Sequence, residues 1–360
     1  MASTAQPLPF FGRAWHVAVD TSDGEHLVVA SSQFEEALRA TFVIEMYPQK
    51  IYWQAIVTIY NLASETASRI RAGAPDFATI WKQRDTRIEL GNAVTVSAGY
   101  QSDANGKFDP GANVLYRGQV LQPVWTRENV VDYKLILRLV TGLVENTLNS
   151  VSISIEKGAT DYDAVKQICG QAGTPIAIEN IDAGARERLS RAKYSRGQVF
   201  HGRPYEPIGE IMRQNNLFYW VSPNGLNVRS FDPKSPPKDP DYAYGPPELP
   251  GSYTTGGTKQ GLVKRTLIGV PEQTQDGVVF RVLLDPQVRI GDVVQLAAGT
   301  VIQPHPFQYG QLPPIPSVDG LYVVAGIRHV GDTRGRGNDW YTEVVAVNAV
   351  AFPDILLRGR

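Results

Sequence analysis

The chain has 360 residues, of which 42% are hydrophobic, and its formal net charge is −1. This length predicts two to four domains with ample hydrophobic cores. The near-zero charge excludes a nucleic-acid-binding protein that depends on a general basic field. The sequence has no apolar run long enough for a membrane span, and the stretch MASTAQPLPFFGRAW lacks the basic start and apolar segment of a signal peptide, so we expect neither.

Many short β-segments separated by turn residues run through the sequence. The 33 glycines and 25 prolines punctuate these segments and do not form one long disordered tract. This pattern predicts a mainly β, α+β protein. The one cysteine, Cys169, cannot form an internal disulfide, so the fold suits a reducing compartment or is indifferent to redox conditions. Cys169 lies on the apolar side of a predicted helix, which favours a packed thiol over a nucleophile.

The first region, residues 1–144, is predicted to be a β-module with one short helix. ATFVIEM (40–46) and AIVTIY (55–60) alternate apolar and polar residues as strands do. Ser64 is the predicted N-cap of a helix over 64–71. The remaining strands are predicted at 93–100, 114–124 and 132–140, and a polar, turn-rich loop occupies 101–113.

The middle of the chain, residues 145–231, mixes helices and strands. Helices are predicted over 161–171 and 205–214, and a β-hairpin over 217–231. The basic run at 186–196 is interpreted as a solvated, loop-rich surface or a subunit contact. Residues 232–261 are rich in proline and form the clearest linker. We expect this linker not to pair within a central sheet, because proline lacks the backbone donor.

The third region, residues 262–350, is predicted to be a second β-module, and residues 351–360 form a tail that can dock on a partner. Its strands are predicted at 278–284, 293–297, 321–328 and 341–347. Its long loops, 300–319 and 331–340, carry no apolar periodicity.

The first and third regions share a repeated sequence. IELGNAVTVSAG (88–99) aligns without a gap with VRIGDVVQLAAG (288–299). An apolar strand precedes each copy, and Leu115-Tyr116 and Leu321-Tyr322 follow the respective loops. A Gly-Asx pair before a strand is common hairpin chemistry, so these segments alone leave chance open. The shared order of the flanking elements favours a duplicated β-module.

A search for catalytic or metal-binding patterns finds none. The five histidines occupy separate segments without the spacing of a zinc site. The common serine-hydrolase and phosphate-loop motifs are absent. GDTRGRG (331–337) lies between predicted strands and not before a helix, so it is interpreted as a hairpin loop. We therefore expect no enzyme activity, no metal site and no cofactor.

The order of these features resembles the baseplate hub proteins of contractile-tailed bacteriophages. These form the late-control or tail hub family, which is related to the N-terminal hub portion of type VI secretion spike proteins. The resemblance spans most of the chain. It rests on IVTIYNLASETASRI (56–70), LGNAVTVSAGY (90–100), TDYDAVKQIC, YEPIGEIMRQNNLFYWVSPNGLNV, GVVFRVLLDPQVRIGDVVQL and DGLYVVAGIRHVGDTRG.

The resemblance implies a mainly β (α+β) fold in which two tail-tube-like β-barrels flank a mixed α/β middle domain. The expected division of the chain is a first barrel at 1–144, the middle domain at 145–231, a Pro/Gly-rich linker at 232–261, a second barrel at 262–350 and a C-terminal tail at 351–360.

The resemblance also implies a structural baseplate or tail hub without enzyme activity. Three copies would form a ring of pseudo-sixfold symmetry that joins the sixfold tail tube to the threefold central spike. The expected partners are further copies of the chain, the tail tube or tube-initiator protein, the spike and the baseplate wedge proteins, with the tape measure protein as a further candidate. DNA can pass through the lumen without specific binding. The expected location is the virion tail baseplate, assembled in the host cytoplasm.

We expect the subunit or tube interface to involve helix 64–71, loop 101–113 and loop 303–316, which are polar and lack core periodicity. The candidate interface residues are Ser64, Glu65, Arg69, Arg71, Gln101, Asp103, Lys107, Asp109, Gln303, His305, Gln308 and Tyr309.

Other classes of protein are also considered. A single-ring tail protein (tube, initiator or distal tail) can use the same barrel, but such proteins usually carry one barrel. The second copy and the long middle region therefore favour a hub. A β-rich enzyme that degrades cell wall is a further alternative. A cellular adhesion module of two barrels is disfavoured by the missing signal sequence and disulfides.

Overall fold

The computed structural model describes the backbone over fifteen stretches of the chain. These are residues 11–21, 23–30, 38–48, 52–72, 91–101, 108–142, 150–171, 176–231, 240–245, 264–296, 300, 302, 304, 320–335 and 339–348.

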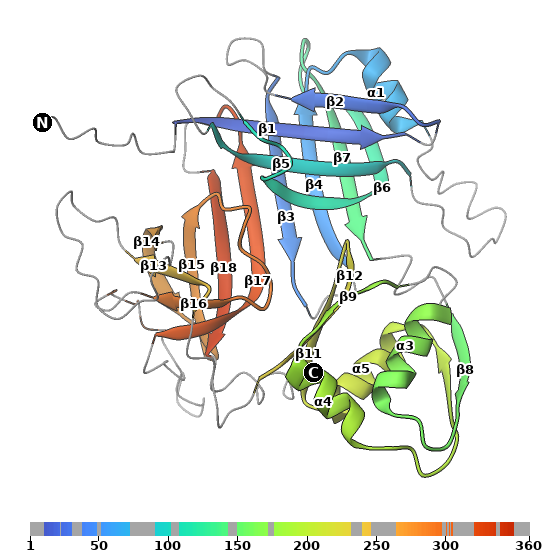
Figure 1. Ribbon diagram of the computed structural model, residues 1–360. Helices are drawn as coiled ribbons and strands as arrows, with labels where there is room; N and C mark the ends of the chain where they lie inside the picture. Colours follow the sequence, from blue (N-terminus) through green and yellow to red (C-terminus); the bar gives the residue numbers. More distant parts are fainter. Residues whose placement is uncertain are drawn as a thin grey trace, which may run out of the picture.

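One sheet of thirteen strands contains both the first and the third region (Figure 1). The first region supplies β1 (Phe11–Asp20), β2 (His26–Ala30), β3 (Ala40–Met46), β4 (Trp53–Tyr60), β5 (Ala93–Gln101), β6 (Val114–Arg127) and β7 (Tyr133–Thr141). The later part of the chain supplies β13 (Tyr242–Gly245), β14 (Lys264–Gln273), β15 (Gly277–Leu283), β16 (Val293–Leu296), β17 (Leu321–Asp332) and β18 (Trp340–Asn348). Their order is β16-β13-β14-β15-β18-β17-β3-β4-β7-β6-β5-β1-β2. The prediction of a mainly β protein is confirmed.

The sequence forms these strands because apolar residues recur at every second position. In β3, Phe42, Ile44 and Met46 are buried while their neighbours are partly exposed. β4 repeats the pattern with Val57 and Ile59. Such alternation places one face of the sheet in the core and leaves the other face accessible.

The two tail-tube-like barrels expected from the resemblance are not both closed among the described strands, because the two halves join edge to edge in one sheet. In the later half, β16 also pairs with β17, so the pairings among β13 to β18 form a circuit. No such circuit exists in the first half, since no pairing joins β1 or β2 to β3 among the described strands. The outer edge of β3 is occupied by β17 instead.

The predicted repeat is confirmed in the backbone. The order β3-β4-β7-β6-β5 recurs as β14-β15-β18-β17-β16. In the first half, the Gly91 amide donates to the Val120 carbonyl over 2.9 Å, and the Val120 amide donates to Asn92 over 3.0 Å. The later half repeats this pair of bonds between Gly291, Val324 and Asp292, at 2.8 and 2.9 Å. A register shift follows both Val120 and Val324, so these two residues are structural equivalents.

Two details of the repeat differ from expectation. Tyr116 pairs with Val96, whereas Tyr322 pairs with Val294, so the two Leu-Tyr dipeptides are displaced by two residues and are not equivalent. In addition, β1 runs antiparallel to β5, whereas β13 runs parallel to β16. The repeat therefore covers five strands, and the sixth position is filled differently in each half.

The junction between the halves is the antiparallel pair β17–β3. It extends from Ile327 opposite Met46 to Asp332 opposite Thr41. At its end, the Arg39 guanidinium contacts the Asp332 carboxylate at 2.7 Å. The backbone amides and oxygens beyond the last pair are also satisfied: the Thr333 amide donates to the Ala40 carbonyl, and the Ala40 amide donates to the Thr333 hydroxyl, both at 3.0 Å. Arg13 of β1 donates to the Asp332 carbonyl at 2.7 Å.

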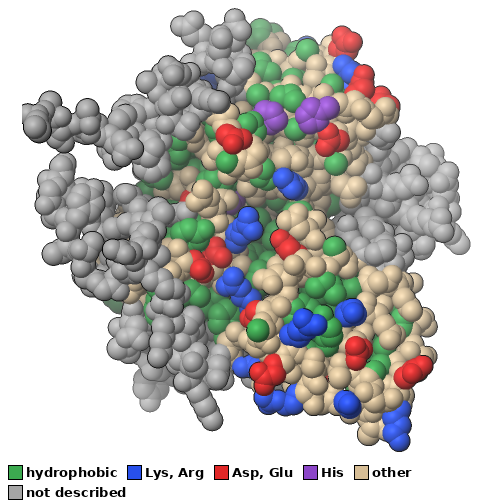
Figure 2. All heavy atoms as spheres, in the orientation of Figure 1, with side chains coloured by type: hydrophobic (Ala, Val, Ile, Leu, Met, Phe, Trp, Pro, Cys, Tyr) green, Lys and Arg blue, Asp and Glu red, His purple; other side chains and the backbone are tan. Residues whose placement is uncertain are grey.

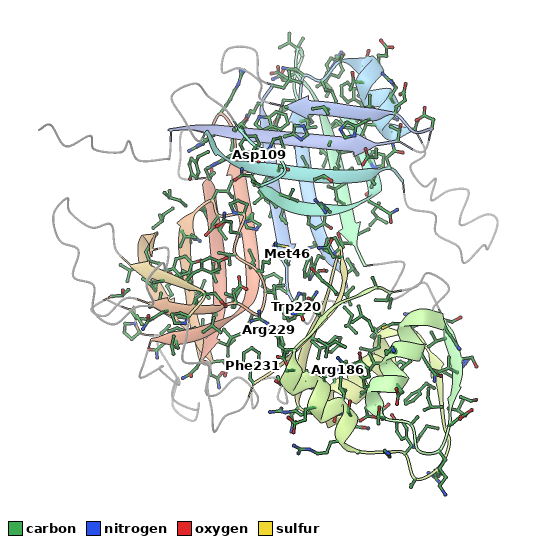
Figure 3. All side chains as sticks on the ribbon, in the orientation of Figure 1. Met46, Asp109, Arg186, Trp220, Arg229 and Phe231 are labelled. Atoms are coloured by element: carbon green, nitrogen blue, oxygen red, sulfur yellow. The ribbon has the colours of Figure 1, made fainter. Side chains whose placement is uncertain are left out.

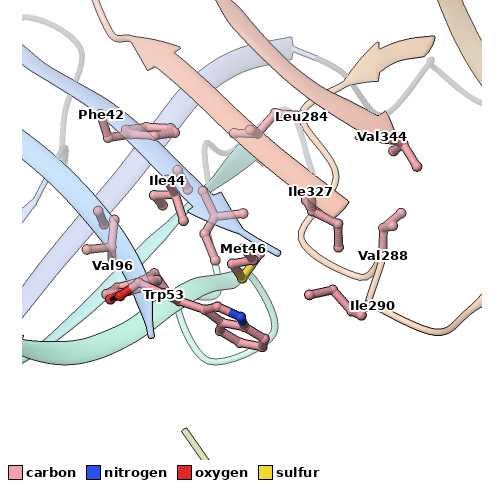
Figure 4. Packing of buried hydrophobic residues seen from close by; sticks show 14 of the residues in the cluster. Phe42, Ile44, Met46, Trp53, Val96, Leu284, Val288, Ile290, Ile327 and Val344 are labelled. Carbon is pink, nitrogen blue, oxygen red and sulfur yellow. Dashed lines mark hydrogen bonds between the residues drawn. The ribbon is translucent and has the colours of Figure 1, made fainter. Parts of the chain in front are cut away.

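One hydrophobic core runs beneath this junction (Figure 4). Met46 of β3 faces Ile327 of β17 and Ile290 of the loop before β16, and all three are buried. Phe42 packs edge to face against Trp340 of β18, with ring centroids 5.4 Å apart. The two halves are thus joined by apolar packing as well as by backbone hydrogen bonds.

The middle of the chain packs around a second core of its own. Helices α3 (Asp161–Gln171), α4 (Ala183–Arg191) and α5 (Tyr205–Gln214) lie with strands β8 (Val151–Ile155), β9 (Ile178–Ile181), β10 (Gln198–Gly202), β11 (Leu217–Ser222) and β12 (Gly225–Ser230). β11, β12 and β9 form one small sheet, and β8 and β10 another. Figure 1 shows this region at one end of the thirteen-stranded sheet. The division of the chain at 144, 231 and 261 stays a prediction.

Two interpretations of the sequence are corrected here. Tyr242–Gly245, inside the expected linker, pairs with both β14 and β16 as β13. This is possible because YAYG contains no proline, so its backbone donors are available. The basic run at 186–196 is not all loop, since α4 covers its first part. In α4, Arg188 caps the carbonyls of Asn216 and Phe231 at 3.0 and 3.2 Å.

We predict that Gly331→Ala weakens the junction. A methyl group at this position would overlap the Phe42 ring, which is itself held by Trp340. Overpacking of this kind should lower the free energy of unfolding by roughly 1 to 3 kcal/mol, measured by urea denaturation. Gly170→Ala in α3 is the control, because nothing lies near its added methyl group. It should leave stability unchanged or raise it. Equal effects of the two variants would contradict the steric argument.

Candidate assembly interface

The free edge of β6 is the first part of the candidate interface. β17 uses one edge to pair with β16 and, beyond the register shift, with β3. In the equivalent strand β6, the same edge pairs with β5 only from Val114 to Gln119. From Gln122 to Arg127 its partner is β7 alone, among the strands that the structure describes. Within the described residues, β6 therefore has no strand partner along the edge where its equivalent β17 pairs with β3.

The free edge of β14 is the matching part. β14 is the repeat equivalent of β3, and β3 uses its outer edge to pair with β17. β13 covers β14 only from Lys264 to Thr266. From Leu267 to Gln273, the described strands offer β14 no partner other than β15. One molecule thus carries both halves of a junction of the kind that it already forms internally.

Exposed apolar residues accompany both edges. At the tip of the β6–β7 hairpin, Val130 and Val131 are 84% and 76% exposed. On β14, Val270 is 54% exposed. Pro123 and Pro271 lie on the two edges, where a missing backbone donor limits uncontrolled strand addition. Apolar side chains at a hairpin tip are unusual, because turns favour polar residues, and such groups mark contact surfaces.

The tip is held rigidly by polar side chains. The Asn129 side-chain oxygen accepts from the amides of Val131 and Asp132, both at 2.9 Å. The Asp132 carboxylate accepts from Asn129 at 2.6 Å and from Asn61 at 2.8 Å, and these hydrogen bonds lower its pKa. Asn61 adopts a positive φ of 54° just before α1 (Ser64–Arg71). These hydrogen bonds brace the backbone of the turn that carries the valines, which reduces the backbone entropy lost on binding.

Helix α1 carries four of the predicted interface residues. Ser64, Glu65, Arg69 and Arg71 are exposed, while Ala67 and Ile70 face the core. Arg69 forms an ion pair with Glu25. The prediction that Ser64 is the N-cap is wrong, because the helix begins at Ser64 and Ala63 occupies the cap position. At the other end of the helix, the side-chain amide of Asn92 donates to the backbone carbonyls of Ile70 and Ala72, both at 3.1 Å.

The two loop candidates that the structure describes, Gln101 and Asp109, lie away from α1. Asp109 shapes the approach to β6, since its carboxylate accepts from the Gly111 amide at 2.9 Å. Asp109 comes after the C-terminal end of β5, and this end of the strand lies away from α1 (Figure 3). Gln101 ends β5. The other candidates lie outside the described residues: Asp103, Lys107, Gln303, His305, Gln308 and Tyr309.

Two buried titratable groups, Cys169 and His329, are packed in the described cores. Burial raises the pKa of the Cys169 thiol to about 12, so the packed thiol expected from the sequence is confirmed. Burial lowers the pKa of His329 to about 3, and its Nδ1 lies 2.9 Å from the Thr342 hydroxyl. No group of side chains within the described part of the chain could hold a metal ion. None of the helices described has the length and hydrophobicity that crossing a membrane requires.

The repeat places different residues at one buried position. Asn92 in the first half corresponds to Asp292 in the later half. Burial raises the pKa of Asp292 from 3.8 to about 6, and the nearby Asp241 carboxylate acts in the same direction. Its hydrogen bond from the Arg289 amide, at 2.7 Å, opposes this shift only in part. An ionised carboxylate is therefore costly here, whereas the amide at Asn92 is neutral.

Comparisons with known proteins find similar structures only. No family model and no curated protein matches the chain. Its structure is similar to a tail protein from Neisseria meningitidis MC58, with 13% identity, coverage of 96% of this chain and 99% of that chain, and a TM-score of 0.47. It is also similar to the 43 kDa tail protein of prophage MuSo2 from Shewanella oneidensis, with 13% identity, 94% and 99% coverage and a TM-score of 0.49.

A third similar structure is the E. coli c3393 protein. It is described as a component of the type VI secretion system with structural similarity to the T4 tail proteins gp27 and gp5. The identity is 7%, the coverage is 88% of this chain and 75% of that chain, and the TM-score is 0.45. The chain is thus similar in structure to phage tail proteins over nearly its full length. At these identities the likeness concerns the fold alone.

Sequence reasoning missed the two free edges and the valine tip. The repeat is visible in the sequence. The periodicity of apolar residues does not show which edge of a strand remains unpaired, because pairing depends on the order of strands in the sheet. One local signal was present. The stretch ENVVD (128–132) places two β-branched apolar residues in a turn.

We predict that Asp292→Asn stabilises the protein at neutral and alkaline pH. The folded-state pKa of Asp292 lies above its unfolded value, so the wild type loses stability as pH rises from about 4 to about 6. The variant should lack this loss and should be more stable above pH 6 by roughly 2 to 3 kcal/mol. Urea denaturation across this pH range measures both effects.

The mirror variant serves as the control. Asn92→Asp removes the two hydrogen bonds to the end of α1, so it should destabilise the protein at all pH values above the carboxyl pKa. A pH profile of Asp292→Asn identical to that of the wild type would contradict the cost assigned to this carboxylate.

Proposed function

We propose that the protein is a structural hub of a bacteriophage tail, in which three copies form a ring that joins a sixfold tail tube to a threefold spike. The observation that carries the proposal is the internal β17–β3 junction, together with free edges of the same kind on β6 and β14. If β6 of one copy pairs with β14 of the next, each copy repeats between molecules the junction that it forms within itself.

Symmetry explains why three copies suffice. Each chain contains two similar five-stranded units, so three chains present six. Head-to-tail pairing of β6 with β14 uses two different surfaces, and such heterologous contacts close into a ring when the rotation permits. Three identical chains cannot match a sixfold tube with identical contacts, but six similar units can approximate it. The middle regions, one per chain, would keep threefold symmetry for the spike.

The uncovered face of the sheet would line the ring. β1, β2 and β5 cross β4 and β7 in Figure 1, and in this arrangement they would lie on the outside of the ring. The opposite face of β15, β18, β17 and β3 carries a row of alternating charges across the junction. Arg281 contacts Glu343 at 2.8 Å, and Arg328 contacts Glu343 at 4.0 Å and Glu45 at 3.7 Å. Guanidinium groups paired in this way would not hold a passing DNA strongly.

The proposal assigns no chemical reaction to the chain. Its partners would be two further copies, the tail tube or its initiator, the spike and neighbouring baseplate proteins, and its location the virion tail. The free edges and the apolar tip favour assembly over catalysis, since both are surfaces that other chains cover.

We predict that cysteines at Thr126 and Glu272 form a disulfide between copies. Thr126 is equivalent to Val330, and Glu272 to Val43, and Val330 pairs with Val43 within the chain. Opposite Cα atoms of antiparallel strands lie about 4.5 to 5.5 Å apart, within the range for a disulfide. The T126C/E272C variant should oxidise to a covalent trimer of three 39.6 kDa chains, seen by non-reducing electrophoresis.

The native Cys169 is buried and does not compete in this experiment. The control is T126C/V28C, because Val28 is exposed on β2, an edge that the repeat does not match with β6. It should give no discrete trimer. Absence of cross-linked trimer from T126C/E272C, at concentrations where light scattering finds a trimer, would contradict the proposed strand pairing. A hexamer of single chains would favour a tail-tube ring.

We further predict that V130D/V131D weakens association without loss of folding. Both valines are exposed in the single chain, so charge there costs little stability. In the ring they would lie beside the neighbouring copy, where carboxylates are costly to bury. Light scattering should show the trimer midpoint moving to an at least tenfold higher protein concentration. V199D is the control, since Val199 is exposed on β10, away from both edges.

A further inference from the structure

A cavity of about 820 Å³ lies where the two halves of the sheet meet the middle region. The first half contributes the ends of β3 and β4 and the residues around Arg117. The later half contributes the loop 286–292, and the middle region contributes β9 and the β11–β12 hairpin. Figure 3 shows Met46, Trp220 and Arg229 facing this space from the first half and the middle region. The cavity is therefore built within one chain and does not depend on ring formation.

Three arginines from three parts of the chain line the cavity: Arg117, Arg229 and Arg289. Arg117 and Arg289 are exposed, and Arg229 is half-buried. Arg229 donates one hydrogen bond to the Gly291 carbonyl. None of the three forms an ion pair with a described residue. Figure 2 shows Lys and Arg side chains beside apolar side chains in the groove at the centre of the view.

The carboxylates of the cavity wall are already engaged. Glu179 accepts hydrogen bonds from Ser222, from Asn224 at 3.1 Å and from Asn227 at 2.6 Å. Asp292 is buried and accepts from the backbone amide of Arg289. These two groups attract the arginines at a distance but leave their planar donor faces open. A ligand with carboxylate groups can use those faces, because guanidinium and carboxylate match in geometry and charge.

The rest of the wall is apolar. Trp53, Trp220, Val288 and Ile290 line the cavity and are buried to more than nine-tenths. A single small anion would leave most of this volume and all of the apolar wall unused. The combination of separated cations and apolar side chains fits a longer ligand that carries both acidic and apolar groups.

We propose that this cavity binds an acidic, extended peptide segment of a partner protein, with Arg117 and Arg289 contacting its carboxylates and the tryptophan-containing wall contacting its apolar side chains. Because the cavity walls come from three parts of the chain, an occupant would also hold the middle region against the sheet. The proposal is independent of the ring: it stands or falls on binding to the single chain.

The test uses calorimetric titration of the full chain with an end-blocked hexapeptide of alternating glutamate and leucine. Binding should weaken steeply with added salt. R117Q/R289Q should weaken it about tenfold or more, since a hydrogen bond between a guanidinium and a carboxylate is stronger than one between neutral groups. These two side chains make no hydrogen bond within the described fold, so folding should be preserved. R138Q is the matched control, because Arg138 is exposed on β7 outside the cavity.

Retention of binding in R138Q with loss in R117Q/R289Q supports the proposal. Equal loss in both variants would show nonspecific charge attraction and would overturn it. No binding of the glutamate peptide, or equal binding of the lysine counterpart, would also overturn it. Binding of a short duplex DNA at this site in place of the peptide would identify a nucleic-acid site instead. A monomeric protein that binds the peptide would refute the ring without affecting this proposal.

Discussion

The antiparallel pairing of β17 with β3 is the interaction on which the rest of the structure depends. It converts two β-modules into one sheet and places Met46, Ile327 and Ile290 in one core. Backbone hydrogen bonds alone contribute modestly, because they replace bonds to water. The shared apolar core beneath the junction and the clasp between Arg39 and Asp332 make the arrangement specific. Were the junction absent, the facing edges of β3 and β17 would both be left without this partner.

The internal junction also explains why the molecule has unpaired edges at all. Each unit has one edge of the β17 type and one edge of the β3 type. Because the two units pair only once within the chain, one edge of each type is left over. In this chain those edges are β6 and β14. Natural proteins usually protect such edges, and here prolines do so only in part. The exposed valines beside β6 and on β14 are the apolar groups that another copy would cover in the proposed ring.

The two copies of the repeat differ in how they fill equivalent positions. The first copy places a helix after β4 and holds its end with Asn92, whereas the second places Asp292 at the same position without a helix. In the second copy, β13 completes a circuit of strand pairings. In the first copy, the outer edge of β3 pairs with β17 instead. The middle region then meets both copies around a cavity with three arginines, a feature that neither copy has alone.

The sequence by itself determined the strand content, the repeat and the packed state of Cys169, because each follows from local periodicity or composition. The predicted N-cap of α1 was wrong by one residue. The backbone just before the helix is positioned by the hydrogen bond from Asn61 to Asp132, a residue seventy-one positions away. Tyr242–Gly245 was predicted to be part of a linker, because a short strand between prolines gives no periodic pattern of apolar residues. Only the tertiary structure decided which strand edges remain open and which arginines share one cavity. Both depend on the order of strands in the sheet, and that order is set by long-range packing, which no local pattern encodes.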